Sequence, residues 1–363
     1  MTEAGPQVPF LVDPYLEWVR REGVPIHEDF GFDLMALELA PWPRFDALGA
    51  YAHARGRGDF ANMYVCEIPP GKQTAPQRHL FEEVVYVLAG RGSTTVRIGA
   101  AEHSFEWGTG SLFALPLNTP YRHFNGSGRE PARFVSVTDL PLVLNVFRDE
   151  DFIWNNAHSF TDRFGAPEHF RGEGTFLPVR PGRHMWETNF VPDLRTFELK
   201  TWQARGAGGS NIMFVLANGT MHAHMSEMPV GTYKKGHRHG ADFHVFAVTG
   251  HGYSLYWYER DRDFERFDWR HGCVFAPTDM LYHQHFNTSA EPARYLAIAF
   301  GGLRYPTLAD KRATFTGMDV SVKEGGRQIE YEDEDPRIRR LYEEELRRSG
   351  VLSRMGEFMP APS

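Results

Sequence analysis

The residues best suited to chemistry in this 363-residue chain are histidines, and they gather in two short stretches of its C-terminal half. His237 and His239 are separated by one residue, and His283 follows about forty residues later. Side chains at alternate positions of a strand project from the same face, so His237 and His239 point the same way if their segment is extended. A third imidazole from a neighbouring strand completes a three-nitrogen face. We therefore predict a metal site formed by His237, His239 and His283.

The elements that must hold these histidines have the character of short strands. The chain contains 35 Gly and 24 Pro, and 14% of its residues are aromatic, which favours many turns and few long helices. Runs typical of strands, separated by Gly and Pro, recur from residue 51 onward: Asn62–Ile68, Glu83–Leu88, Ser93–Ile98, Ser111–Leu115 and Ala132–Val137. Short strands at regular spacing predict a sandwich or a barrel.

These runs belong to an internal repeat with a period of about 160 residues. Four short motifs recur in the same order at nearly one offset, which indicates a tandem of two similar β domains. The matching pairs are Glu67-Ile-Pro-Pro-Gly71 with Glu227-Met-Pro-Val-Gly231, Gly90-Arg-Gly92 with Gly250-His-Gly252, His123-Phe-Asn125 with His285-Phe-Asn287, and Glu130-Pro-Ala-Arg133 with Glu291-Pro-Ala-Arg294.

Short helices are predicted on both sides of the repeats. Asp13 and Pro14 are typical of the cap and first turn of an N-terminal helix. Asp335, Pro336 and Gly350 bound a C-terminal amphipathic helix whose apolar stripe is Ile338, Leu341, Tyr342 and Leu346. The predicted organisation is an N-terminal extension (1–50), a first domain (51–148), a packed aromatic linker (149–205), a second domain (206–304) and a C-terminal extension (305–363).

The two repeats resemble cupins. In that family a Gly is followed after five residues by His-x-His, then by a Glu and a Gly, and a second motif has a Pro, a metal-binding His and an Asn four residues later. In the C-terminal repeat, Gly231, His237, His239 and Gly250 match the first motif, and Pro277, His283 and Asn287 match the second. The resemblance implies an all-β fold of two tandem jelly-roll barrels with helical N- and C-terminal extensions.

Both repeats depart from the family pattern. In the N-terminal repeat His79 and Glu83 are in place, but Gln77 and Tyr121, which are poor replacements for a neutral imidazole, stand where two His ligands are expected. We therefore expect a site without metal that is structural or contacts the substrate, with His123 as the alternative ligand. In the C-terminal repeat Phe243 stands at the Glu position. Either three histidines bind the metal without a carboxylate, or a β-bulge re-aims the adjacent His244 or Asp242 to serve as a fourth ligand.

Three neutral imidazoles hold a divalent ion without cancelling its charge and leave coordination positions for substrate and O₂. This arrangement resembles gentisate-type and thiol-type cupin dioxygenases, although in the gentisate enzymes the metal is usually assigned to the N-terminal cupin. The first hypothesis is therefore an Fe(II) dioxygenase acting on a small aromatic or dicarbonyl acid. The alternatives are a non-redox decarboxylase, lyase, hydrolase or isomerase that uses Mn, Ni or Zn, and a non-catalytic cupin that binds a small molecule.

Further residues are expected around the metal. His285 shares a strand face with His283, so it either orients a ligand or binds the metal in its place. His224 is a second candidate for the pocket. The expected pocket wall is aromatic and comprises Phe246, Tyr253 or Tyr256, Trp257, Tyr282 and Phe286. Lys234, Lys235 and Arg238 are candidates to meet a substrate carboxylate, with Arg238 better interpreted as a surface residue.

Net charge and cysteine content indicate which partners and which cellular compartment to expect. The net charge of −8 argues against nucleic acid or an anionic membrane as a partner. Two cysteines, Cys66 and Cys273, cannot form a disulfide framework, which indicates a reducing compartment. The sequence shows neither a secretory signal pattern nor an apolar run long enough to span a bilayer. We expect a cytoplasmic protein that forms a homodimer, the latter implied only by the resemblance.

Overall fold

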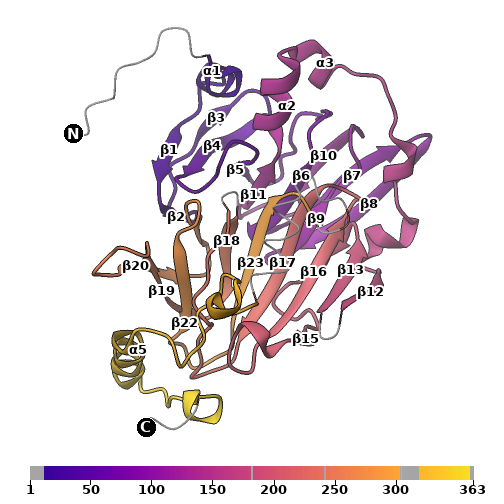
Figure 1. The fold of residues 1–363 in the computed structure, drawn as a ribbon. Coiled ribbons are helices and arrows are strands. Elements are labelled where there is room, and N and C mark those ends of the chain that lie inside the picture. The colour runs from indigo at the N-terminus through magenta and orange to yellow at the C-terminus, as the bar shows by residue number, and fades with distance from the viewer. Residues whose placement is uncertain (1–11, 181–182, 241–242, 303, 305–318, 360–363) are drawn as a thin grey trace.

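The computed structural model describes residues 12–180, 183–240, 243–302, 304 and 319–359. Within them, two large sheets face each other across the middle of the molecule, and each is accompanied by a three-stranded sheet (Figure 1). Each large sheet and its small partner form one barrel; we call these the N-terminal barrel and the C-terminal barrel. The predicted all-β fold with two barrels is confirmed.

The N-terminal barrel has an eight-stranded sheet in the order β1-β4-β5-β11-β6-β9-β14, with β3 paired to β4, and a small sheet in the order β10-β7-β8. Its strands are β1 (Ile26–Asp29), β3 (Ala40–Trp42), β4 (Ala47–Ala54), β5 (Asn62–Ile68), β6 (Glu83–Ala89), β7 (Arg91–Ile98), β8 (Ala101–Gly108), β9 (Leu112–Ala114), β10 (Tyr121–Asn125), β11 (Ala132–Thr138) and β14 (Phe190–Val191).

The C-terminal barrel repeats this plan. Its nine-stranded sheet runs β12-β13-β16-β17-β23-β18-β21-β2, with β15 paired to β16, and its small sheet runs β20-β19-β22. Its strands are β2 (Gly31–Asp33), β12 (Thr175–Arg180), β13 (Arg183–Thr188), β15 (Lys200–Thr201), β16 (Ser210–Leu216), β17 (Met221–Met228), β18 (His244–Thr249), β19 (His251–Trp257), β20 (Glu265–Arg270), β21 (Cys273–Phe275), β22 (Tyr282–Asn287) and β23 (Ala293–Phe300).

The two barrels exchange strands through equivalent pairings. β2, from the N-terminal extension, pairs with β21, and β14, from the segment between the barrels, pairs with β9. β1 and β13 pair in parallel with β4 and β16. The duplication therefore includes residues 183–201, in the segment that the sequence analysis assigns to the linker. Asp33-Leu34 with Trp42, and Asp193-Leu194 with Trp202, repeat at the same offset of 160.

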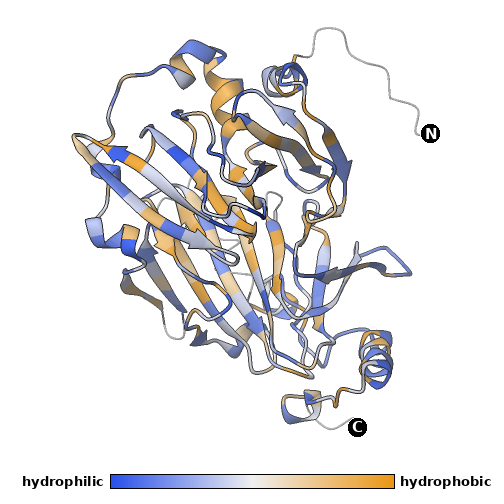
Figure 2. Cartoon of the chain, turned by 180° about the vertical axis from the view of Figure 1, so that it is seen from behind, coloured by the Kyte–Doolittle hydropathy of each residue, from blue (hydrophilic) through white to orange (hydrophobic). Residues whose placement is uncertain are grey.

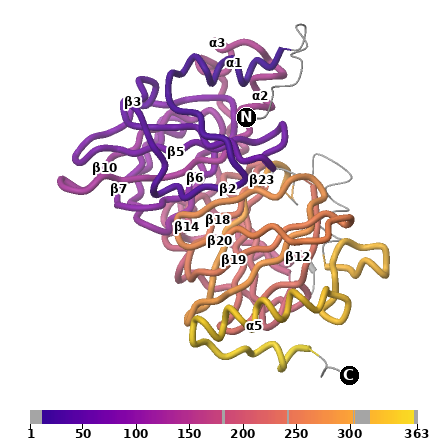
Figure 3. Tube along the Cα trace, turned by 90° about the vertical axis from the view of Figure 1, so that its left-hand side faces the viewer, coloured from indigo at the N-terminus to yellow at the C-terminus, as the bar shows by residue number. Residues whose placement is uncertain are grey.

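The two large sheets share one apolar core. Val65, Tyr86 and Val135 of the N-terminal barrel belong to the same buried cluster as Phe246 and Ile298 of the C-terminal barrel. The Tyr86 and Phe246 rings lie 5.9 Å apart. Figure 2 shows apolar residues along these strands, and Figure 3 shows the two halves of the chain side by side. Each large side chain buried here contributes roughly 1.5–3 kcal/mol, so the two barrels stabilise one another.

The predicted terminal helices are present with their predicted caps. α1 (Pro14–Arg21) begins after Asp13, whose side chain accepts a hydrogen bond from the Leu16 amide. α2 (Leu140–Phe147) and α3 (Glu150–Trp154) follow β11 of the N-terminal barrel. α5 (Pro336–Ser349) begins after Asp335 and ends at Gly350, which has left-handed backbone angles. One residue of its predicted stripe is wrong, because Leu341 is exposed.

The C-terminal extension covers the C-terminal barrel (Figure 1). The Tyr342 hydroxyl of α5 donates to the carbonyls of Thr232 and Asn287. Residues 320–331, which we call the strap, run beside the His237 segment: the Ile329 amide donates to the Gly236 carbonyl, and the Gln328 amide group donates to the Ala204 carbonyl. In the part of the chain described, no helix is long and apolar enough to cross a bilayer.

Candidate metal centre

Three buried histidines of the C-terminal barrel converge on one point. One ring nitrogen from each of His237, His239 and His283 lies within 4.8 Å of the others. The cluster is held by backbone pairing, because the His237 amide donates to the His283 carbonyl at 3.0 Å and the His283 amide donates back at 2.9 Å. His283 is on β22, and His237 and His239 precede β18, so two adjacent segments bring the three predicted ligands together.

Backbone carbonyls fix the orientation of each ring. Nδ1 of His239 lies 2.7 Å from the Gly240 carbonyl oxygen, Nδ1 of His283 lies 3.0 Å from that of Leu281, and Nδ1 of His237 lies 3.4 Å from that of Lys235. A carbonyl can only accept a hydrogen bond, so each Nδ1 carries the proton and each lone pair is on Nε2. Three Nε2 atoms close together are a donor set that fits a divalent metal ion.

The electrostatics of the pocket keep these imidazoles neutral. Burial lowers the pKa of His237 well below its ordinary value, and the nearby positive charge of Arg205 lowers it further. Burial also lowers the pKa of His283 well below its ordinary value, with a further contribution from His239. Neutral imidazoles have the lone pair that metal binding requires, so protons compete weakly for this site.

The position expected for a carboxylate ligand is apolar. The Phe243 ring packs against His239 with 4.4 Å between centroids, and Val245 also lines the cavity. His244 alternates with them and therefore faces the other side of β18, where its charge acts on His53 of the N-terminal barrel. The structure does not bring His244 to the cluster, because β18 is regular at this point. Asp242 lies outside the described residues.

The cluster opens into a cavity of about 30 Å³. Both His285 and His224, which the sequence analysis placed near the pocket, line it. Nδ1 of His285 lies 2.8 Å from the Ser254 hydroxyl, which also accepts a hydrogen bond from the Trp269 indole. Nδ1 of His224 lies 2.8 Å from Nε2 of His222. The polar wall of the cavity is thus built from histidines fixed by their neighbours.

The aromatic wall predicted from the sequence is not part of this cavity. Tyr282 and Trp257 stack on each other with centroids 5.7 Å apart, and Arg238 lies over the Tyr282 ring. On β22 the side chain of Tyr282 alternates with those of His283 and His285 and points away from them. Phe246 faces the core between the barrels, and Tyr253, Tyr256 and Phe286 belong to other apolar clusters.

Both arginines of the cavity lining were missed by sequence reasoning. Arg183 and Arg205 both line the cavity and are nearly fully buried. Arg183 lies over the Trp202 ring at 3.9 Å and donates to the Asn211 side chain. Arg205 is in the short 3-10 helix η3 (Gln203–Arg205), and it occupies the place that Phe45 has 160 residues earlier. Aligning the repeats upstream of residue 206 would have revealed it.

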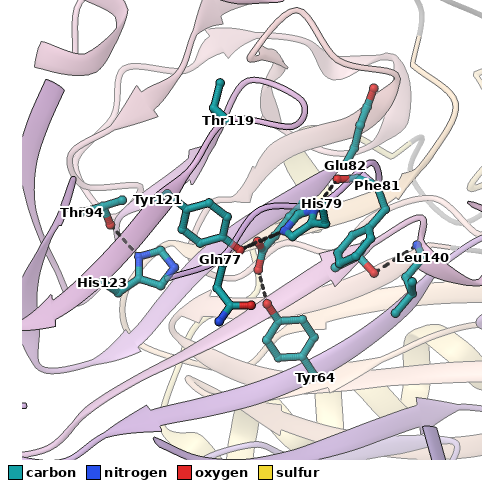
Figure 4. A network of polar contacts seen from close by, with 12 residues as sticks. Tyr64, Gln77, His79, Phe81, Glu82, Thr94, Thr119, Tyr121, His123 and Leu140 are labelled. Atoms are coloured by element: carbon teal, nitrogen blue, oxygen red, sulfur yellow. Dashed lines mark hydrogen bonds and ion pairs between the residues drawn. The ribbon is translucent and has the colours of Figure 1, made fainter. Parts of the chain in front are cut away.

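The equivalent site of the N-terminal barrel is filled by its own hydrogen bonds. Tyr64 and Tyr121 donate to the two carboxylate oxygens of Glu83, and Nε2 of His79 lies 3.0 Å from the Tyr121 hydroxyl. Figure 4 shows Tyr64, Tyr121 and His79 pointing toward one another. The Gln77 side chain is turned away and donates to the carbonyls of Arg44 and Ala75. Polar groups that could meet a metal are thus occupied by each other.

One match to a known family lies in the N-terminal barrel. Residues 64–138, from β5 to the end of β11, match the family model described as Cupin domain. The strands β17 to β23 repeat the topology of this matched segment. We therefore call the two barrels the N-terminal cupin and the C-terminal cupin. The narrower resemblance to gentisate dioxygenases stays a prediction.

Solved structures similar to this chain include two oxalate decarboxylases. A variant of the Bacillus subtilis enzyme is 14% identical with a TM-score of 0.49, and the match covers 81% of this chain and 85% of that one. A formate complex of the Lactobacillus farciminis enzyme is also 14% identical with a TM-score of 0.49, with coverage of 79% and 90%. No curated protein matches the chain.

The buried Glu83 carboxylate makes the folding stability of the protein depend on pH in the acidic range. Burial alone would raise the pKa of Glu83, but the hydrogen bond and charge of His79, with further hydrogen bonds, lower it from 4.5 to about 2. Because the folded state lowers this pKa, the carboxylate stabilises the fold at pH values above 4.5. This contribution, about 3 kcal/mol, is lost as pH falls from 4.5 to about 2. Glu83→Gln should remove that pH dependence.

Denaturant unfolding of the metal-free protein across this range measures the effect. Glu102→Gln, at an exposed position, is the control and should keep the wild-type slope. Equal slopes for wild type and Glu83→Gln would contradict the stabilised carboxylate.

Proposed function

We propose that the chain is a metal-dependent enzyme that acts on a short organic acid in its C-terminal cupin. The observation that carries the proposal is the set of three Nδ1-to-carbonyl contacts, which directs three neutral Nε2 atoms to one point. Three neutral histidines converging in a barrel interior are costly unless something binds them. A purely structural role does not explain why all three imidazoles carry the proton on Nδ1 and leave Nε2 free to bind.

The donor set indicates which ions fit. Imidazole nitrogens suit Zn, Fe and Ni, whereas Mn is favoured by sites with carboxylate or water ligands, and Phe243 removes the carboxylate here. When bound, the ion supplies Lewis-acid polarisation of a carboxylate or carbonyl oxygen. Neutral ligands leave its charge uncancelled, which favours an anionic substrate.

Residues of the chain supply the rest of the site. His224 faces the cavity with its Nδ1 bonded to His222, which leaves Nε2 as the atom that would take or give a proton. His285 is held by Ser254 and borders the same space. The strap lies beside His237, where Gln328 is 1% exposed, and so limits entry of water.

The size of the cavity bears on the class of reaction. The space of about 30 Å³ is narrow, so the walls would have to move for either kind of substrate. A short acid needs less movement than a hydroxylated aromatic ring. This favours the non-redox alternative, a decarboxylase or another lyase, over a dioxygenase of aromatic acids.

The second candidate remains an Fe(II) dioxygenase. It is supported by the absence of a carboxylate from the three-histidine cluster of the described residues, since an uncrowded metal face leaves positions for both a substrate and O₂. Its substrate would have to be a short acid such as a small dicarbonyl compound.

Metal binding is tested with matched variants of the two cupins. His239→Ala removes a ligand and should weaken binding of Zn(II) by more than about 100-fold, since losing even a group that supports a ligand costs about 10- to 100-fold. His79→Ala changes the equivalent histidine of the N-terminal cupin and should leave affinity unchanged. Competition with a fluorescent chelator measures both. Equal Zn(II) affinities for the two variants would contradict the proposed metal centre.

The reaction class is tested by turnover with and without oxygen. The protein, loaded with Zn, Ni or Fe(II) in turn, is incubated with a series of short 2-oxo acids and dicarboxylates, and products are followed by NMR. We expect conversion of at least one acid under argon with a redox-inactive ion. Turnover that requires both Fe(II) and O₂ would overturn the lyase assignment in favour of the dioxygenase.

A further inference from the structure

The side chain of Arg205 is a buried cation that forms no direct ion pair within the described residues, although the charge of Asp319 acts on it and partly offsets the lowering of its pKa by burial. It is 6% exposed, and its Nε makes no hydrogen bond within the described chain. The ion pairs of the described residues do not include it, whereas other partly buried arginines are paired, as Arg294 is with Glu227 and Arg133 with Glu67. Burying a charge without a partner is costly, so native proteins rarely keep one unless it has a use.

The position of this guanidinium is fixed relative to the metal centre. The Lys235 amide donates to the Arg205 carbonyl at 3.1 Å, which ties η3 to the segment that carries His237. The side chain lines the same cavity as His237, His283 and His285. After burial, its charge is the largest cause that lowers the pKa of His237 and His285.

A second buried cation lies beside it. Lys234 is 2% exposed, and burial, followed by the charge of Arg205, lowers the pKa of its ammonium group to about 7. Arg183 also lines the cavity, whereas Lys234 lies behind Arg205 and does not border it. The charged side chains of the lining are therefore both cations, and no carboxylate stands at the position of Phe243 to oppose them. An anion entering the cavity would relieve this repulsion.

The N-terminal cupin shows that the fold does not need a cation there. The Ala75 amide donates to the Phe45 carbonyl at 2.7 Å, the same contact that Lys235 makes with Arg205 one repeat later. In that barrel the position is occupied by Phe45, which packs against Trp42 and Tyr64. The charge is thus a property of the cavity that has the histidine cluster, and the filled barrel lacks it.

We propose that Arg205 is the carboxylate-binding residue of the C-terminal cavity and that the ligand is a short mono- or dicarboxylate held between this guanidinium and the histidine cluster. The inference rests on the proposed function for the metal, but the anion contact is separate from it. A guanidinium meets a carboxylate through two parallel hydrogen bonds, which gives both affinity and orientation. The narrow cavity favours a ligand with a short chain.

Binding of malonate to the full-length Zn(II)-loaded protein tests this inference by isothermal titration. Arg205→Met should bind malonate at least about 10-fold more weakly, because a hydrogen bond to a charged group is lost. Arg205→Lys keeps the charge and should recover part of the affinity. Arg294→Met, which removes an ion-paired arginine outside the cavity, should bind malonate as the wild type does.

Two further readouts separate a binding role from a structural one. Without anion, Arg205→Met should unfold at a temperature equal to or higher than the wild type, since it removes an uncompensated buried charge. Its Zn(II) content should equal that of the wild type. A lower unfolding temperature together with unchanged malonate affinity would overturn the inference while leaving the metal centre intact. If the wild-type protein did not bind Zn(II), that result would instead refute the proposed function.

Discussion

The site depends on one kind of contact, the hydrogen bond between an imidazole Nδ1 and a nearby backbone carbonyl. The three carbonyls belong to Lys235, Gly240 and Leu281, each within two residues of the histidine it orients. Local backbone conformation therefore sets the tautomer, and pairing of the His237 segment with β22 sets the distance. An isolated peptide would fix neither the tautomers nor the distance between the histidines, so the candidate metal centre requires the folded barrel.

The two cupins meet the cost of buried polar groups in opposite ways. In the N-terminal cupin the Glu83 carboxylate is satisfied by tyrosines and by His79. In the C-terminal cupin Phe243 replaces that carboxylate, and neutral imidazoles share the cavity with Arg205. The carboxylate of one barrel is held by internal hydrogen bonds, whereas the polar groups of the other are the ones for which we propose a metal ion and an anion as partners.

Much of this architecture was predictable from local patterns. β5 begins and ends where the sequence predicts, and the caps at Asp13 and Asp335 are as expected, because strand and cap signals depend on neighbouring residues. Which side chains face the cavity was harder to predict. Tyr282 and His244 point away from it because side chains alternate along a strand, and which alternate set faces inward depends on how the strands pair. Arg205 escaped notice because the repeats were aligned only from residue 206 onward, and a buried arginine has no local sequence pattern of its own.

The most direct test of the account is X-ray absorption spectroscopy of the Zn(II)-loaded protein. The account predicts three imidazole nitrogens at about 2.0–2.1 Å, with the remaining coordination supplied by water or an added carboxylate. His239→Ala should leave two imidazoles. A spectrum that shows fewer than three imidazoles in the wild type, or a carboxylate from the protein among the ligands, would contradict the three-histidine centre.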